Sequence, residues 1–334
     1  MNGKKIFSVI TLNIVVTLLL CGVVLFVFNL YFYRNDTLQN LPGYFFTSKD
    51  TGMRYLLNPF SSVSRAGIDY TINSLGFRDR EFDIKKPKGQ YRILCVGDSF
   101  TFGEGVKAQE AYPKVLETML QTKYKNVEVI NTGVMGYNTV DEYLYIRNKL
   151  LFLNADLIIL GFFIGNDPED PTLPFNQKMV VPESARIGET PLEKHFREQE
   201  HMKKLTKENY YWKYINSIWD PEGYQWKRRC KDALRGIRDL AIAKNIDLLV
   251  FVLPNIQPSP EDWLRFHFQL TNFLDELKVR HVDALAKLRK NNCVYEIVGH
   301  GNSHPNATMN KSYAETLFEF ICDNNYLKKE TVPT

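Results

Sequence analysis

Apolar residues recur along this chain in short continuous runs, separated by stretches with helical spacing. Three runs are apolar and largely β-favouring and end at turn-forming residues, as buried strands do: 91–96, 127–130 and 157–163. A fourth run, 246–253, stops at Pro254. Helices are expected over 226–244, 259–277 and 310–322. Alternating strands and helices predict a three-layer α/β/α sandwich with a mainly parallel sheet.

The N-terminal region follows a different pattern. No charged residue occurs from Ile6 to Phe32, a span longer than the ~20 residues that a helix needs to cross a bilayer. Its end carries aromatic residues that suit a membrane interface, namely Phe26, Phe28, Tyr31, Phe32 and Tyr33. No small-residue cleavage site follows, as a cleaved signal peptide would require. We therefore expect one N-terminal transmembrane helix.

The charges beside this span favour one orientation. Lys4 and Lys5 precede it, whereas Arg34 and Asp36 follow it. Positively charged residues collect on the cytoplasmic side of membrane proteins. We therefore expect the folded domain outside the cytoplasm, in the periplasm or at the outer face of the inner membrane.

The periodic pattern stops after Asn166 and resumes near Tyr224. Prolines and charged residues fill the first part of this stretch, and an aromatic cluster follows over 210–219. Long insertions in compact domains often act as lids or binding loops, and an ordinary surface excursion is an equal alternative. The predicted organisation is an anchor over 1–34, a lead-in segment over 35–90 and a folded domain over 91–330 with an insertion at about 168–224.

Composition narrows the possible partners. The 334 residues are 44% hydrophobic, which is enough to bury a full α/β core. The net charge is +4, and Lys and Arg are dispersed among Asp and Glu, so we expect no nucleic-acid partner. His300 and His304 are close in sequence, but no acidic or Cys ligand lies at a recognisable spacing, so no metal is expected.

Small polar residues follow each of the first three strand-like runs. Ser99, Gly133 and Asn166 would therefore meet at the carboxyl edge of the sheet, where open α/β sheets bind ligands. A serine hydroxyl needs an adjacent base to act as a nucleophile, and His304 is the best-placed candidate. The N–H groups of Ser99 and Gly133 and the Asn166 amide would then stabilise negative charge on a carbonyl oxygen.

Two acidic residues lie beside these positions. Asp98 is expected to fix the turn before Ser99, and Asp167 to anchor the loop that carries Asn166, both by accepting hydrogen bonds from backbone N–H groups. We expect neither carboxylate to take part in proton transfer.

Four blocks resemble, in order, the motifs of the SGNH (GDSL-type) hydrolase family: 96–101, 131–133, 165–167 and 304–306. The resemblance implies a flavodoxin-like fold in a membrane-anchored bacterial member. It also implies an esterase or O-acyl hydrolase that needs no cofactor and acts on acyl esters of envelope carbohydrate or lipid. Segment 73–79 is similar to a lead-in common in bacterial members, and we interpret it as a turn and a docking strand with Phe77 in the core.

One position departs from the family pattern. An Asp usually lies three residues before the catalytic His, and here that position is Gly301. The alternatives are a Ser–His dyad, a backbone carbonyl that orients the ring, or a carboxylate from elsewhere such as Glu296. Three functions stay open: an esterase, an O-acyltransferase on a cell-surface polysaccharide that uses the same residues, or a catalytically silent glycan-binding or scaffold module.

Overall fold

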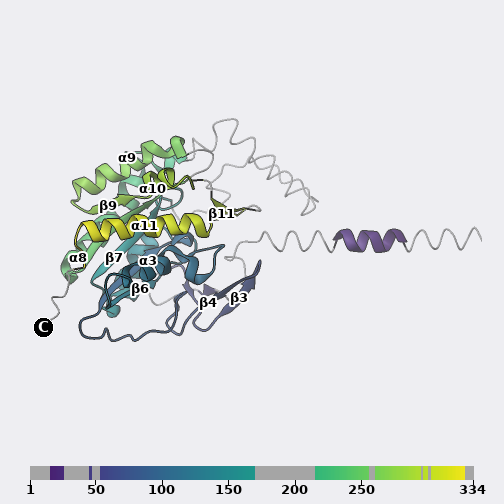
Figure 1. Ribbon diagram of the computed structural model, residues 1–334. Coiled ribbons are helices and arrows are strands. Elements are labelled where there is room, and N and C mark those ends of the chain that lie inside the picture. Colours follow the sequence, from purple (N-terminus) through teal and green to yellow (C-terminus); the bar gives the residue numbers. More distant parts are fainter. Residues whose placement is uncertain are drawn as a thin grey trace, which may run out of the picture.

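A five-stranded parallel sheet forms the centre of the domain. The computed structural model describes residues 16–25, 45–46, 53–169, 215–255, 260–294, 296–299 and 302–327. The strands lie in the order β6 (Val127–Asn131), β5 (Tyr91–Gly97), β7 (Leu157–Phe163), β8 (Asp247–Leu253) and β9 (Arg280–Asp283). Figure 1 labels β6, β7 and β9 of this sheet. Every neighbouring pair of strands is parallel.

Alternate side chains of the strands point to opposite faces, and each face has its own apolar cluster. Leu94 and Val96 belong to one cluster, whereas Ile93 and Cys95 belong to the other. The first cluster includes side chains of α4 (Thr139–Tyr145), α8 (Lys231–Lys244) and α9 (Pro260–Glu276), and the second includes those of α3 (Tyr112–Gln121), α10 (Leu285–Lys290) and α11 (Ala307–Asp323). The predicted three-layer α/β/α sandwich is confirmed.

Shorter elements surround the sheet. Antiparallel pairs are formed by β1 (Phe45–Phe46) with β2 (Leu56–Leu57), β3 (Ser62–Arg65) with β4 (Ile68–Thr71), and β10 (Ile297–Gly299) with β11 (Asn302–Pro305). The short helical segments are α2 (Ser99–Phe102), the 3₁₀ turns η2 (Ala108–Glu110) and η4 (Leu151–Leu153), and the π-helical segments η3 (Ile146–Leu150) and η5 (Tyr224–Cys230). The helix expected over 226–244 therefore comprises η5 followed by α8.

The expected membrane anchor lies mostly outside the described residues. Residues 16–25 are helical, and large apolar side chains in this stretch are exposed, among them Leu18 and Leu25. Within the described ranges, no helix has the length and hydropathy needed to cross a bilayer. The anchor and the orientation of the domain stay predictions.

Most of the expected insertion also lies outside the described residues, but its last part enters the core. Trp219 is fully buried, and its ring lies 4.7 Å from that of Trp226 and 5.1 Å from that of Phe266. The Trp219 indole N–H donates to the Ile164 carbonyl just beyond β7. This part of the aromatic cluster therefore packs against the domain.

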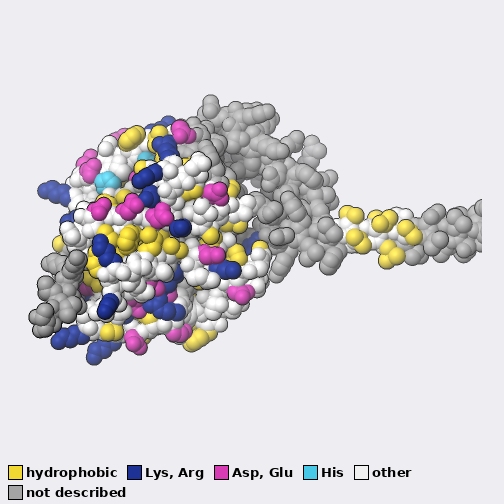
Figure 2. Space-filling view, in the orientation of Figure 1, with side chains coloured by type: hydrophobic (Ala, Val, Ile, Leu, Met, Phe, Trp, Pro, Cys, Tyr) yellow, Lys and Arg dark blue, Asp and Glu magenta, His cyan; other side chains and the backbone are white. Residues whose placement is uncertain are grey.

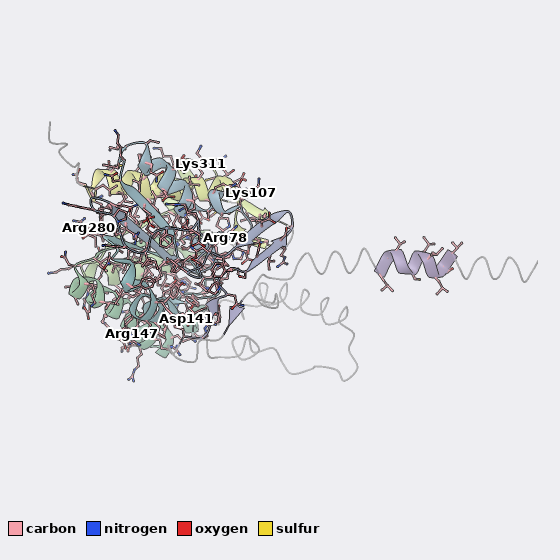
Figure 3. The ribbon with its side chains drawn as sticks, turned by 90° about the horizontal axis from the view of Figure 1, so that it is seen from below. Arg78, Lys107, Asp141, Arg147, Arg280 and Lys311 are labelled. Carbon is pink, nitrogen blue, oxygen red and sulfur yellow. The ribbon has the colours of Figure 1, made fainter. Side chains whose placement is uncertain are left out.

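The lead-in segment is attached to the loop after α2 through Arg78. Phe77 is 3% exposed, which confirms its expected place in the core. The Arg78 guanidinium, unforeseen in this role, donates to the carbonyls of Phe102, Gly103 and Val106 at 3.0, 2.6 and 2.7 Å. Figure 3 shows Arg78 within the domain. A buried charge needs such hydrogen bonds, and here it fixes the backbone that follows α2.

Replacing Arg78 with methionine is expected to destabilise the protein by roughly 2–4 kcal/mol, because three carbonyls lose a charged hydrogen-bond donor. Methionine keeps the packing of the aliphatic part of the arginine side chain. Thermal unfolding should show a fall in Tm of about 5–15 °C. Arg147→Met, at an exposed arginine on η3, is the matched control and should leave Tm nearly unchanged. Equal Tm values for the two variants would contradict a bracing role for Arg78.

Candidate active site

Ser99 lies at the carboxyl end of β5, at the first position of α2. Asp98 is the N-cap of this turn, and its Oδ1 accepts a hydrogen bond from the Phe100 N–H at 2.9 Å. This is the role expected for Asp98. The turn is tight because Gly97 has no side chain: a Cβ there would lie 2.1 Å from Thr101 Oγ1. Local structure thus places the Ser99 hydroxyl at the edge of the sheet.

The structure brings Ser99 and His304 together. His304 lies on β11, and its Nε2 is 2.7 Å from Ser99 Oγ. The hairpin that carries His304 leads directly into α11, whose N-cap Asn306 accepts a hydrogen bond from the Met309 N–H at 3.1 Å. Residues separated by more than two hundred positions therefore meet at hydrogen-bond distance, as a nucleophile and its base must.

Asn302 fixes the protonation pattern of the His304 ring. Its Oδ1 accepts a hydrogen bond from the His304 backbone N–H at 2.9 Å, and the same oxygen lies 2.7 Å from His304 Nδ1. A backbone N–H can only donate, so the amide atom is an acceptor and Nδ1 carries the proton. Nε2 then holds a lone pair and accepts from the Ser99 hydroxyl.

The group that meets His304 Nδ1 is thus the Asn302 amide and not the Glu296 carboxylate. Glu296 binds Asn306 Nδ2 at 2.8 Å instead of the His304 ring. A side-chain oxygen therefore occupies the place at Nδ1 where a backbone carbonyl was also considered. Gly301 and His300 lie outside the described residues. Asn302 was not predicted because the family pattern places the partner of the histidine three residues before it, whereas Asn302 lies two residues before His304.

Gly133 does not present a free N–H to the site in this structure. Its N–H donates to Asn131 Oδ1 at 3.0 Å, so the expected contact with a substrate oxygen stays a prediction. Packing explains why this position is a glycine, because a Cβ here would lie 2.3 Å from the Phe102 nitrogen. Gly133 therefore allows the turn after β6 to approach α2 closely.

Asn166 reaches the same edge of the sheet from the end of β7. Its Nδ2 lies 3.4 Å from the Tyr137 carbonyl, and its side chain also hydrogen-bonds to the Asp98 carboxyl. The following residue anchors the loop as expected, because Asp167 Oδ2 accepts a hydrogen bond from the Phe163 N–H at 2.8 Å. The 3.4 Å contact is longer than a good hydrogen bond, so this amide can change partner at little cost.

Comparison with known proteins finds solved structures of similar fold. No family model matches the chain. A protein of Mycoplasma pneumoniae described as uncharacterized is 36% identical over 85 residues, which are 24% of this chain and 9% of that protein. A putative lipolytic protein of the G-D-S-L family from Desulfitobacterium hafniense is 17% identical, with 69% of this chain and 99% of that chain covered and a TM-score of 0.43.

A second solved structure is a catalytic mutant of an acetylxylan esterase from Geobacillus stearothermophilus. It is 12% identical, with 71% of this chain and 96% of that chain covered and a TM-score of 0.45. In fold the chain is similar to these two proteins. The likeness concerns the fold alone, and the activities of those two proteins are not assigned to this chain.

Behind Ser99 lies a group of buried carboxyls. Burial raises the pKa of Asp98 to about 7, and it raises the pKa values of Glu142 and Asp167 well above the usual carboxyl range. The neighbouring charge of Asp98 raises both of these pKa values further. Among the described residues, neither Glu142 oxygen has a hydrogen-bond partner. Burial and these neighbours therefore favour the protonated form of Glu142.

Replacing Glu142 with glutamine is expected to stabilise the protein at alkaline pH. A raised folded-state pKa contributes stability that is fully present below the unfolded-chain pKa and is lost as pH rises through the folded pKa. At pH 8 the variant should exceed the wild type by on the order of 1–3 kcal/mol in unfolding free energy. Urea unfolding at pH 5 and pH 8 measures this, with Glu319→Gln at an exposed helix position as control. A pH slope unchanged in Glu142→Gln would contradict the prediction.

The His304 ring itself is enclosed by apolar and acidic neighbours. Its ring lies 5.4 Å from that of Phe100, which stacks on Phe163 at 3.9 Å between centroids. Burial lowers the pKa of His304, and the carboxylate of Glu104 raises it in part. Nε2 is thus unprotonated, as a base must be, down to a lower pH than in an exposed histidine. Sequence reasoning did not identify Glu104, although it lies between two glycines directly after α2.

Proposed function

We propose that this protein is a serine-dependent ester hydrolase in which Ser99 is the nucleophile and His304 the base. The observation that carries the proposal is the 2.7 Å contact between Ser99 Oγ and His304 Nε2. The ring tautomer supports it, because Nδ1–H bound to Asn302 leaves Nε2 free to accept the serine proton. A weak nucleophile beside a correctly oriented base is the arrangement that acyl transfer requires.

The proton then moves as follows. Ser99 Oγ attacks the ester carbonyl carbon while its proton passes to Nε2, and the resulting imidazolium returns that proton to the leaving alcohol oxygen. A water molecule then attacks the acyl carbon and gives a proton to Nε2. The bond between Ser99 Oγ and the acyl carbon breaks, and Oγ takes that proton back from Nε2. Each half-reaction ends with a neutral His304, so no cofactor is consumed.

Two groups are available to stabilise the oxyanion. Ser99 occupies the first position of α2, so its backbone N–H has no acceptor within the helix. The Asn166 amide can exchange its 3.4 Å contact with the Tyr137 carbonyl for the substrate oxygen. Each such donor is worth about 2.7–4 kcal/mol in the transition state. The Gly133 N–H would join them only after release from Asn131.

The proposed substrates are acyl esters of envelope carbohydrate or lipid. The apolar span from Ile6 to Phe32 supports an anchored domain that meets such substrates at a membrane. The wall formed by Phe100 and Phe163 beside His304 offers apolar surface to an acyl group. Both oxygens of the scissile ester would then face polar groups while the acyl chain faces these rings.

A serine-directed phosphonate ester carrying a fluorescent tag tests this proposal on the full-length chain. We expect one covalent adduct per molecule, located on Ser99 by peptide mass spectrometry, and hydrolysis of a short-chain chromogenic ester that this reagent abolishes. Labelling at another serine, or no labelling with intact near-UV circular dichroism, would contradict it. If adding a glycan acceptor diverts the acyl group to that glycan, the same residues serve acyl transfer instead of hydrolysis.

A further inference from the structure

Glu104 lies beside the reacting nitrogen of His304. Its Oε2 is 3.5 Å from Nε2, and its side chain is 7% exposed. The backbone holds it there, because the Glu104 N–H donates to the Ser99 carbonyl at 3.0 Å. The flanking Gly103 and Gly105 have φ angles of 83° and 87°, which favour glycine, and Arg78 binds the Gly103 carbonyl. The carboxylate is thus part of a fixed turn.

The chemistry of the site calls for a negative charge near His304. In a Ser–His–Asp arrangement the carboxylate beside Nδ1 both orients the ring and stabilises the imidazolium that forms during acyl transfer. Asn302 orients the ring here but carries no charge. An imidazolium in this partly buried place would otherwise lack a counter-charge, which costs free energy.

We propose that Glu104 supplies from the Nε2 side of His304 the negative charge that Asn302 lacks on the Nδ1 side. This inference rests on the proposed ester-hydrolase function. Glu104 would act as the electrostatic partner of His304: it forms no covalent bond and keeps its charge through the reaction. The proton still travels from Ser99 Oγ to Nε2 and then to the leaving oxygen.

The distances explain how Glu104 can stabilise the ring without capturing its proton. Ser99 Oγ holds the hydrogen-bonding position on Nε2 at 2.7 Å, whereas Glu104 Oε2 stays at 3.5 Å. The longer distance is too great for a good hydrogen bond but is well within the range of charge interaction. The Nε2 proton therefore stays available to the leaving group.

Other ionisable groups near the ring are differently engaged. Asp98 lies behind Ser99, where it caps α2 and has a pKa raised to about 7. Glu296, on the approach to β10, binds Asn306. From the Nδ1 side the neutral Asn302 faces the ring. Among the described residues, Glu104 is the carboxylate within ion-pair distance of His304.

Three variants of the full-length chain test this inference: Glu104→Gln, Asn302→Asp and the double variant. Glu104→Gln is expected to lower kcat on a chromogenic ester roughly tenfold or more, a loss equivalent to at least one pKa unit of imidazolium stabilisation. The acidic limb of its kcat/KM profile should move to lower pH. Asn302→Asp should restore most of the lost rate in the Glu104→Gln background, because the new carboxylate stabilises the same imidazolium.

A second readout needs no substrate. The His304 ring can be titrated by NMR, and its pKa should fall in Glu104→Gln and rise again in the double variant. Glu222→Gln, at an exposed position in an ion pair with Lys227, is the matched control and should change neither quantity.

Several outcomes would overturn the inference. A His304 pKa unchanged by Glu104→Gln would do so whatever the activity. So would a rate loss that Asn302→Asp does not restore, because a purely structural role for Glu104 predicts that result. If wild-type turnover and Ser99 labelling are present while Glu104→Gln is fully active, this inference is wrong and the proposed function stands. If neither turnover nor labelling occurs, the proposed function fails by itself.

Discussion

Replacing Ser99 with alanine is expected to lower kcat for ester hydrolysis by on the order of 10⁵–10⁶, and His304→Ala should cost about as much. The two side chains act as one unit: without the hydroxyl no acyl-enzyme forms, and without Nε2 no group removes the serine proton at 2.7 Å. Steady-state kinetics on a chromogenic ester measure both losses.

The double variant separates this prediction from simple damage to the fold. Because either deletion already disables the unit, Ser99→Ala/His304→Ala should be no slower than either single variant. Ser303→Ala and His281→Ala replace the same residue types away from the reacting atoms, and each should retain near-wild-type rates. Multiplicative losses in the double variant would show that Ser99 and His304 act independently, against the proposed mechanism.

The three central strands of the sheet could be predicted because each is buried on both faces. β5, β7 and β8 are continuous apolar runs bounded by turn residues, and this local pattern is sufficient to locate them. β9, by contrast, is a sheet edge with the sequence Arg-His-Val-Asp and no fully buried residue. It forms no apolar run, so only its pairing with β8 identifies it as a strand.

Residues of the site were predictable where a side chain suited to the chemistry or to a turn directly follows a predicted strand. Ser99 and Asn166 follow strands, and Asp98 and Asp167 accept from backbone N–H groups as short acidic side chains in turns do. For Gly133 the sequence is ambiguous, because a glycine at a strand end can donate its N–H to a ligand or allow a close backbone approach. The decisive partner, Asn131 Oδ1, lies in the same turn.

Asn302 could not be found without the hairpin. In a strand, residues i and i+2 project from the same face, so Asn302 and His304 on β11 share one side of the β10–β11 pair. The sequence around them has no apolar alternation that would predict a strand. Tertiary structure therefore decides which side chain reaches Nδ1, and it selects an amide two residues away.

Asn302→Ala is expected to lower kcat/KM by on the order of 10²–10⁴ while leaving the fold intact. One oxygen accepts from both the backbone N–H and Nδ1 of His304, so its loss frees the ring to rotate and lets the proton move to Nε2. A ring protonated at Nε2 cannot accept the Ser99 proton. The loss should therefore appear mainly in kcat, with KM nearly unchanged, because Asn302 contacts the ring and no substrate group.

Asn302→Asp provides the comparison that distinguishes orientation from charge. The carboxylate can accept the same two N–H groups and adds a negative charge, so activity should equal or exceed that of the wild type above the pKa of His304. The added charge raises that pKa, and the acidic limb of the pH profile should therefore move to higher pH. If Asn302→Ala were as active as the wild type, the contact with Ser99 Oγ alone would suffice to orient the ring. If Asn302→Asp were as slow as Asn302→Ala, accepting the two N–H groups would not explain the role of Asn302. Its amide would then be needed for the structure of the β10–β11 turn.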